Sequence, residues 1–110
     1  KFFTDAPITI TITGDIKNNI NLYIADTKDN IVAEISLSTN NKEGTTIVIE
    51  PTNKKITVTT DGQTVNGYGL TDKTKQSFLY LPQGDYYIGS NMEDEDTGAI
   101  EIAIKRYLFD

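Results

Sequence analysis

The chain has 110 residues, of which 16 are acidic and 10 are basic, so that its formal net charge is −6. Its length predicts one domain that folds without disulfides, and the absence of cysteine and histidine excludes thiolate chemistry, the commonest general base and the commonest transition-metal ligand. The acidic balance argues against nucleic-acid binding, and no apolar run has the length of a membrane span or the core of a signal peptide.

Four runs in the first half of the chain alternate between apolar and polar residues, which is the pattern of a strand with one buried face. They cover residues 8–13, 20–24, 31–37 and 45–50. In the third run a short helix competes with the strand, because Val32, Ile35 and Ser36 also lie about one helical turn apart. We favour the strand, because the alternation continues through Leu37.

A fifth run at residues 55–60 is expected to pair with 45–50 through a short polar connection that contains Pro51. The sequence Asp61-Gly62-Gln63 then marks the next reversal of the chain. Segment 65–75 is rich in glycine and polar residues, and we interpret it as a loop that lays Tyr68 or Leu70 on the core.

The last third holds the densest group of strand-forming residues, in segments 77–81, 86–89 and 99–107. Pro82 presets the first corner of a turn and Gly84 tolerates positive φ, so we expect the first two segments to form a hairpin. In the third segment Ile100, Ile102 and Ile104 lie on one face. We therefore predict three antiparallel strands that bury this face.

The whole pattern, about eight strands separated by turn signals, predicts an all-β domain built as an antiparallel β-sandwich. A jelly roll or another closed variant is the alternative. No internal repeat or linker divides the chain, so we predict a single domain over residues 1–110. Because the first residue is Lys1 rather than Met, we expect the domain to be part of a larger protein.

Four consecutive carboxylates occupy positions 93–96, and carboxylates are the side chains that bind calcium. Neighbouring side chains of an extended loop point apart, however, so we interpret the segment as a solvated loop and predict no metal site. Elsewhere no spacing singles out a pair of carboxylates, no serine motif resembles a nucleophile elbow, and no glycine-rich loop opens a helix. The residues thus predict a non-catalytic domain without a cofactor.

Among the six tyrosines, we single out Tyr80, Tyr87 and Tyr107 as contacts for a ligand or a partner. Exposed tyrosines stack on sugar rings and are also frequent at protein interfaces. Tyr86 and Tyr87 are adjacent on a predicted strand, so one should face the core and the other should face outward. The basic pair at 105–106 either meets acidic residues of a neighbour or forms a solvated edge.

Short motifs spread along the whole chain form a recognisable combination. They are an Ile/Thr strand that ends in Gly14-Asp15, an Asn-rich turn at 18–21, the segment 43–50 before a hairpin over 53–62, the turn Leu81-Pro82-Gln83-Gly84, and the closing Arg106-Tyr107-Leu108. In these motifs the chain resembles the C-terminal domain of the distal tail protein family of siphophages. Two positions depart from the family pattern, with Asp85 where Asn is usual and Glu50 where Asp is usual.

The resemblance implies a galectin-like sandwich that projects from a ring-forming N-terminal half, and hence a structural and docking domain of a phage or prophage tail. It implies that the partners are other tail or baseplate proteins and that the location is the virion tail tip. In some relatives, it also implies contact with host cell-wall saccharide. We expect neither nucleic-acid binding nor membrane insertion, and the isolated domain should be monomeric or weakly associated if the ring-forming half is missing. The alternative is an extracellular carbohydrate-binding module excised from a secreted polysaccharide-degrading enzyme. A surface-layer or adhesin repeat ranks last, because no repeat is present.

Overall fold

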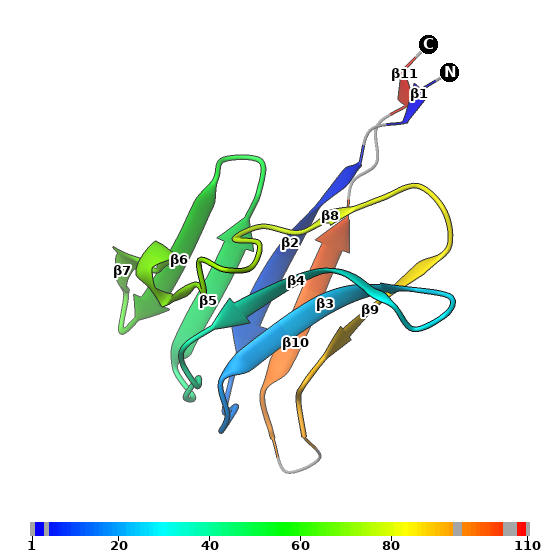
Figure 1. Cartoon of the computed structure of the whole chain (residues 1–110). Helices are drawn as coiled ribbons and strands as arrows, with labels where there is room; N and C mark the ends of the chain where they lie inside the picture. The colour runs from blue at the N-terminus through cyan, green and yellow to red at the C-terminus, as the bar shows by residue number, and fades with distance from the viewer. Residues whose placement is uncertain (1, 4, 94–95, 105–107, 110) are drawn as a thin grey trace.

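The computed structural model describes residues 2–3, 5–93, 96–104 and 108–109, and its main body is a β-sandwich of two antiparallel sheets (Figure 1). One sheet has six strands and the other has three, and no α-helix occurs among the described residues. The predicted fold class is therefore confirmed. No helix in this part of the chain is long and apolar enough to cross a membrane.

The six-stranded sheet is built on β2, which has partner strands on both sides. The order is β10, β2, β5, β6 and β7, and β8 pairs with the beginning of β2. The bounds are Ala6–Thr13 for β2, Thr45–Glu50 for β5, Lys55–Thr60 for β6, Gln63–Asn66 for β7, Tyr80–Leu81 for β8 and Ala99–Ile104 for β10. Within the described residues, β10 and β7 are the two edges of this sheet.

The three-stranded sheet has the order β4, β3 and β9. Their bounds are Ile31–Leu37, Ile20–Asp26 and Tyr86–Ser90, respectively. Segment 70–76 covers the free side of β4, because the N–H of Ser38 donates to the carbonyl of Leu70 and the N–H of Asp72 donates to the carbonyl of Ser36. On the other side of the sheet, β9 is an edge beside which the structure describes no further strand.

The two ends of the described chain leave the sandwich together. β1 (Phe2–Phe3) pairs antiparallel with β11 (Leu108–Phe109). This two-stranded ribbon projects beyond both sheets (Figure 1). Both ends therefore lie on the same side of the domain.

The core between the two sheets consists mainly of isoleucine and leucine. In β2 the residues Ile8, Ile10 and Ile12 are fully buried, whereas the threonines between them are half-buried, as the alternation predicts. The other large side chains that are fully buried are Ile20, Leu22, Ile24, Ile35, Leu37, Ile47, Ile49, Ile56 and Leu79. Burial of one such side chain stabilises a fold by about 1.5–3 kcal/mol relative to its exposure. This apolar layer therefore holds the two sheets together.

Two predicted reversals in the middle of the chain are confirmed. β5 and β6 form a hairpin, with Glu50 opposite Lys55. β6 then ends at Thr60 and β7 begins at Gln63, so Asp61 and Gly62 alone connect them. Both have positive φ, 51° and 78°, which is typical of the two-residue turns that match the twist of a hairpin.

The prediction of a loop over residues 65–75 is wrong for its first two residues, Val65 and Asn66. Residues up to Asn66 continue the ladder with β6 as strand β7, because the tight turn brings them directly alongside it. A short 3-10 turn, η1 (Tyr68–Leu70), follows. Leu70 packs against the core, as one alternative of the prediction has it, whereas Tyr68 is exposed.

The predicted hairpin at 82–85 is also wrong. β8 pairs with β2, whereas β9 pairs with β3 in the other sheet, so segment 82–85 carries the chain from one sheet to the other. The N–H of Ile8 donates to the carbonyl of Leu79 at 3.0 Å, which fixes this part of the chain beside β2. β10 likewise pairs with β2 and not with β9. Turn residues predict a change of direction, but they do not determine which strand the chain joins next.

Candidate functional sites

The tyrosines predicted as contacts are not joined in one platform among the described residues. Tyr80 lies in β8 of the six-stranded sheet and Tyr87 lies in β9 of the three-stranded sheet. Tyr107 lies outside the described residues. Both described hydroxyls have a protein partner: Lys54 Nζ donates to Tyr80 Oη at 2.9 Å, and Tyr87 Oη donates to Asp29.

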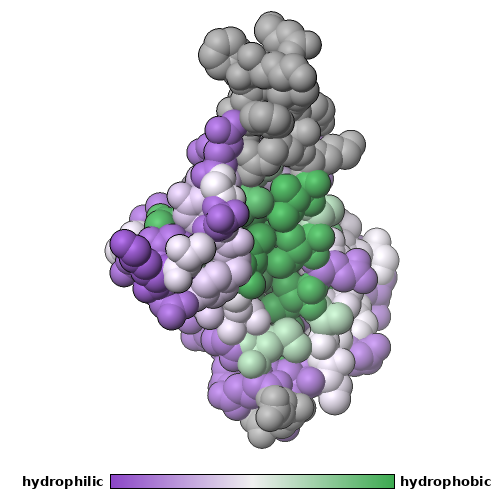
Figure 2. Space-filling model, turned by 90° about the vertical axis from the view of Figure 1, so that its right-hand side faces the viewer, coloured by the Kyte–Doolittle hydropathy of each residue, from purple (hydrophilic) through white to green (hydrophobic). Residues whose placement is uncertain are grey.

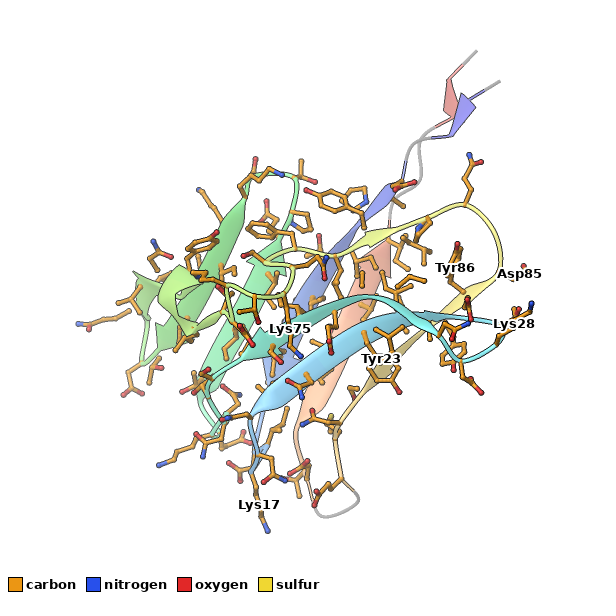
Figure 3. All side chains as sticks on the ribbon, viewed as in Figure 1. Lys17, Tyr23, Lys28, Lys75, Asp85 and Tyr86 are labelled. Carbon is orange, nitrogen blue, oxygen red and sulfur yellow. The ribbon has the colours of Figure 1, made fainter. Side chains whose placement is uncertain are left out.

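Tyr87 faces outward and Tyr86 packs against the core, as predicted for adjacent strand residues. Figure 3 shows Tyr86 at the start of β9. The hydrogen bond to the Asp29 carboxylate raises the pKa of Tyr87 to about 12, because an ionised tyrosine would lose this bond and face the negative charge. Tyr87 thus ties β9 to the loop after β3, and its hydroxyl stays protonated near neutral pH.

Within the acidic segment 93–96, the structure describes Glu93 and Asp96. The Asp96 carboxylate accepts the N–H of Glu93 at 2.9 Å and the N–H of Lys17 at 3.0 Å, and these bonds lower the pKa of Asp96. In the described part of the chain, no group of three or more acidic residues is arranged to hold a metal ion. Asp96 therefore fixes the loop to the turn after β2. The basic pair at 105–106 lies outside the described residues.

A row of apolar side chains along the edge strand β10 is left open between the sheets. Ile100, Ile102 and Ile104 stand opposite the buried isoleucines of β2, so they lie on the core face of the sheet. Nevertheless, Ile102 is 39% exposed and Ile104 is 41% exposed. The prediction that this face is buried is wrong for these two residues, which lie on an edge strand of the larger sheet.

The open face continues from β10 to β9. A narrow groove of about 170 Å³ between the two edge strands is lined by Ile88, Met92, Ile100 and Ile102 together with Leu22 and the Gly89-Ser90 end of β9. Seen from this side, the molecule carries a continuous hydrophobic patch (Figure 2). We call Ile88, Met92, Ile100, Ile102 and Ile104 the open edge.

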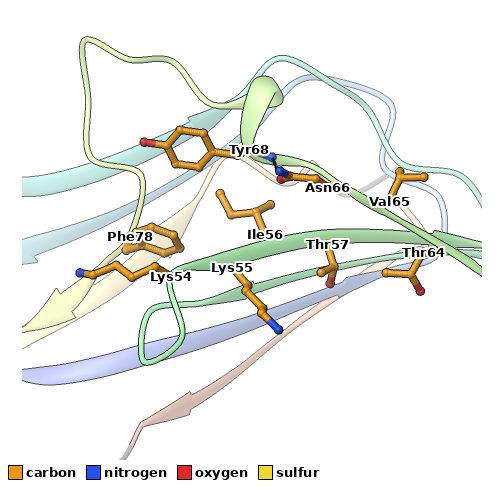
Figure 4. Close-up of a pocket in the computed structure, with 9 residues that line it drawn as sticks. All are labelled: Lys54, Lys55, Ile56, Thr57, Thr64, Val65, Asn66, Tyr68 and Phe78. Carbon is orange, nitrogen blue, oxygen red and sulfur yellow. Dashed lines mark hydrogen bonds between the residues drawn. The ribbon is translucent and has the colours of Figure 1, made fainter.

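A second depression lies at the opposite edge of the same sheet, where β7 ends and the chain turns into η1 (Figure 4). It has a volume of about 620 Å³, which is within the range of small-ligand sites. Its polar lining consists of Lys54, Lys55, Thr57, Thr64 and Asn66, and its apolar lining consists of Ile56, Val65, Tyr68 and Phe78. We call this site the β6–β7 hollow.

Two lysines lie against the aromatic rings of the hollow. The rings of Tyr68 and Phe78 are stacked, with centroids 6.4 Å apart and an angle of 30° between their planes. Lys73 Nζ lies 3.7 Å from the centroid of Tyr68, and Lys54 Nζ lies 5.7 Å from the centroid of Phe78. Lys73 Nζ also donates to the carbonyl of Tyr68 at 2.6 Å. Neutral groups thus hold both ammonium groups in place.

Comparisons with known proteins give no further assignment. No family model, no curated protein and no solved structure matches the chain. The candidate sites are therefore interpreted from their own geometry and chemistry.

The sequence did not reveal where the open edge or the β6–β7 hollow would lie. The isoleucines of β10 were visible as an alternating run, but the run itself does not reveal how far the opposite sheet extends. The hollow draws its residues from segments 54–57 and 64–68 and from Phe78, which the pairing of β6 with β7 and the course of the chain before β8 bring together. The one available signal was the adjacent pair Lys54-Lys55 in an acidic chain.

Proposed function

We propose that this domain is a non-catalytic docking domain of a phage or prophage tail, of the distal tail kind, and that a neighbouring tail protein binds along the open edge. The observation that carries the proposal is the exposed apolar row of β10. An edge strand presents unpaired N–H and C=O groups, and an apolar face beside them favours the addition of an extended segment as a further strand. The tail setting is supported by the resemblance of the sequence motifs.

The chemistry of β10 defines the segment that fits. Its core face offers Ile100, Ile102 and Ile104, which match apolar residues at alternate positions of a partner strand. Glu101 is the one charged residue of β10, and the acidic segment 93–96 precedes the strand. A basic residue opposite Glu101 is therefore favourable. We propose an extended segment in which apolar residues alternate with Lys or Arg.

Another tail protein fits this description better than a second copy of the chain. A second β10 has no basic residue within Ala99–Ile104 to place opposite Glu101. Two copies would also bring together two domains that each carry a net charge of −6. The occupant of the open edge is accordingly a different protein.

The test is a binding titration between the domain and each purified tail protein encoded beside it, followed by calorimetry. We expect one of them to bind, and we expect Ile102→Lys to weaken that binding by at least about tenfold, since a buried lysine at this position has no partner. Val32→Lys is the matched control, because Val32 is an exposed aliphatic residue, 47% accessible, in β4 at the edge of the smaller sheet away from β9. It should leave the affinity unchanged.

Three results would overturn the proposal. One is a folded domain that binds none of these proteins, and another is a complex whose affinity is the same in Ile102→Lys. The third is a dimer of the domain alone, seen by light scattering and lost in Ile102→Lys, which would assign the open edge to a second copy.

A further inference from the structure

We propose that the groove between β9 and β10 is a specificity pocket, which takes one large apolar side chain of the segment that docks at the open edge. The inference rests on the docking function proposed above and adds to it the class of residue that the site selects. When a segment adds to a sheet as a further strand, backbone hydrogen bonds supply affinity and pockets for single side chains supply specificity. Docking does not require such a pocket, so the two proposals can fail separately.

The groove is a notch that leads from the open edge toward the core. The most deeply buried residue of its lining is Leu22 of β3, which is 1% exposed. One wall consists of Ile88 in β9 and Met92, and the other consists of Ile100 and Ile102 in β10. The hydrophobic patch in Figure 2 surrounds this seam between the two sheets. A side chain that enters the groove therefore contacts both sheets.

The volume and the chemistry of the lining define what fills the groove. It measures about 170 Å³, and an apolar cavity of about 150 Å³ holds one benzene ring, so one large side chain fits. Among the described residues that line it, none is charged. Its one side-chain hydroxyl, Ser90 Oγ, accepts the N–H of Met92 at 3.4 Å. Because a charged group would be buried there without a partner, the occupant is a single apolar side chain, which we call the anchor.

The register of β10 places the anchor within the docked segment. An added strand directs alternate side chains to the core face, where they meet Ile100, Ile102 and Ile104. The first two isoleucines line the groove and Ile104 does not. Glu101 lies between those two on the other face and forms no ion pair among the described residues. A Lys or Arg next to the anchor therefore faces Glu101, and the two charges are complementary.

Met92 gives the groove one adaptable wall. A methionine side chain is flexible and polarisable, so it fits neighbours of different shape and makes favourable contacts with aromatic rings. The isoleucines of the facing wall are restricted at χ1, so they hold that wall in place. We therefore expect the pocket to accept phenylalanine, leucine and methionine as anchors. Alanine would leave it largely empty, and aspartate would bury a charge.

The test is an NMR titration of the isotope-labelled domain with short synthetic peptides. Each peptide consists of Thr-Lys repeats in which the central threonine is replaced by phenylalanine, leucine, alanine or aspartate. The phenylalanine and leucine peptides should bind at least about tenfold more tightly than the alanine peptide, as expected for burial of a large apolar side chain. These three peptides have the same charge, so the difference reports on the anchor alone. Binding should shift the amide signals of β10.

Variants of the groove link this preference to the pocket. Ser90→Leu should fill the groove and weaken binding of the phenylalanine peptide by at least about tenfold, with little effect on the alanine peptide. Ser38→Leu is the matched control, because Ser38 is an exposed serine directly after β4, away from the groove. Met92→Ala should widen the groove and shift the preference from leucine toward a tryptophan anchor. A purely structural role of Met92 would leave the order of the peptides unchanged.

The outcomes separate a failure of the pocket from a failure of docking. Equal binding of the phenylalanine, leucine and alanine peptides at β10 would overturn the pocket and leave docking in place. An unchanged affinity of the phenylalanine peptide in Ser90→Leu would do the same. Peptides that do not bind at all would also overturn the pocket, and a tail protein that still docks at β10 would then preserve the docking function. If neither the peptides nor a tail protein binds at β10, both proposals are wrong.

Discussion

Ile102 stands opposite Ile10 in the ladder between β10 and β2, yet Ile10 is fully buried while Ile102 is 39% exposed. Both residues are isoleucines, and both lie on the same face of the sheet. They differ because Ile10 belongs to the core cluster, whereas Ile102 lies on an edge strand and lines the open groove beside β9. The larger sheet therefore carries more apolar surface than its own fold buries, and the proposed docking function depends on this surplus.

The first prediction compares these two isoleucines in the stability of the domain. Ile10→Ala should lower the free energy of unfolding by about 2–5 kcal/mol, because it leaves a cavity in the packed core. Ile102→Ala should cost less than about 1.5 kcal/mol, because its side chain already contacts solvent. Urea unfolding of both variants measures the difference. Equal losses would show that Ile102 is covered in solution, against the description of the open edge.

A second prediction concerns a glycine that ends the acidic loop. A Cβ at Gly98 would lie 2.6 Å from the carbonyl oxygen of Thr13 and 2.8 Å from Ile16 Cγ1, so the backbone must shift. Gly98→Ala should therefore lower the free energy of unfolding by about 1–3 kcal/mol. Gly69→Ala is the control, since no atom lies within 4 Å of the added Cβ, and it should change stability by no more than about 0.5 kcal/mol. Thermal unfolding that ranks the two variants equally would contradict the close approach.

A third prediction follows from the bond between Tyr87 and Asp29. The pKa of Tyr87 is raised to about 12 in the folded protein, above a value of about 10 in the unfolded chain. The bond therefore stabilises the fold fully below about pH 10, and this contribution is lost as the pH rises through the folded pKa. Asp29→Asn, which tolerates the positive φ of 64° at this position, should bring the pKa of Tyr87 back toward its ordinary value.

The measurement for this prediction is an NMR titration of the tyrosine Cζ signals between neutral and strongly alkaline pH. Asp61→Asn is the control, because it makes the same change of charge at another residue with positive φ. A Tyr87 pKa that is the same in the native protein and in Asp29→Asn would show that the carboxylate does not act on the hydroxyl.

The alternation of the sequence was sufficient to place most strands and to predict their buried faces. β2 is the clearest case, because Ile8, Ile10 and Ile12 alternate with threonines and no other element competes for them. The pairing of the strands was harder to predict from the sequence. Pro82 and Gly84 have the chemistry of a hairpin turn, but β8 joins β2 and β9 joins β3, because contacts far apart in the sequence decide the pairing.

Local patterns predict the candidate sites less well than the strands. Ile102 and Ile104 follow the pattern of a buried face, yet they are exposed on an edge strand of the larger sheet. Tyr68 is one of ten aromatic residues in the sequence, and nothing in its neighbourhood along the chain places it near Phe78. Both sites arise from the packing of distant segments, which periodicity does not describe.

The measurement that tests the docking proposal most directly is hydrogen exchange of the backbone amides, made on the domain alone and on its complex with the tail protein that binds it. If a partner segment adds to the sheet, exchange should slow in β10 at residues 99–104 and remain unchanged in β7 at residues 63–66, at the other edge of the sheet. Unchanged exchange in β10, with protection elsewhere on the domain, would contradict docking at the open edge.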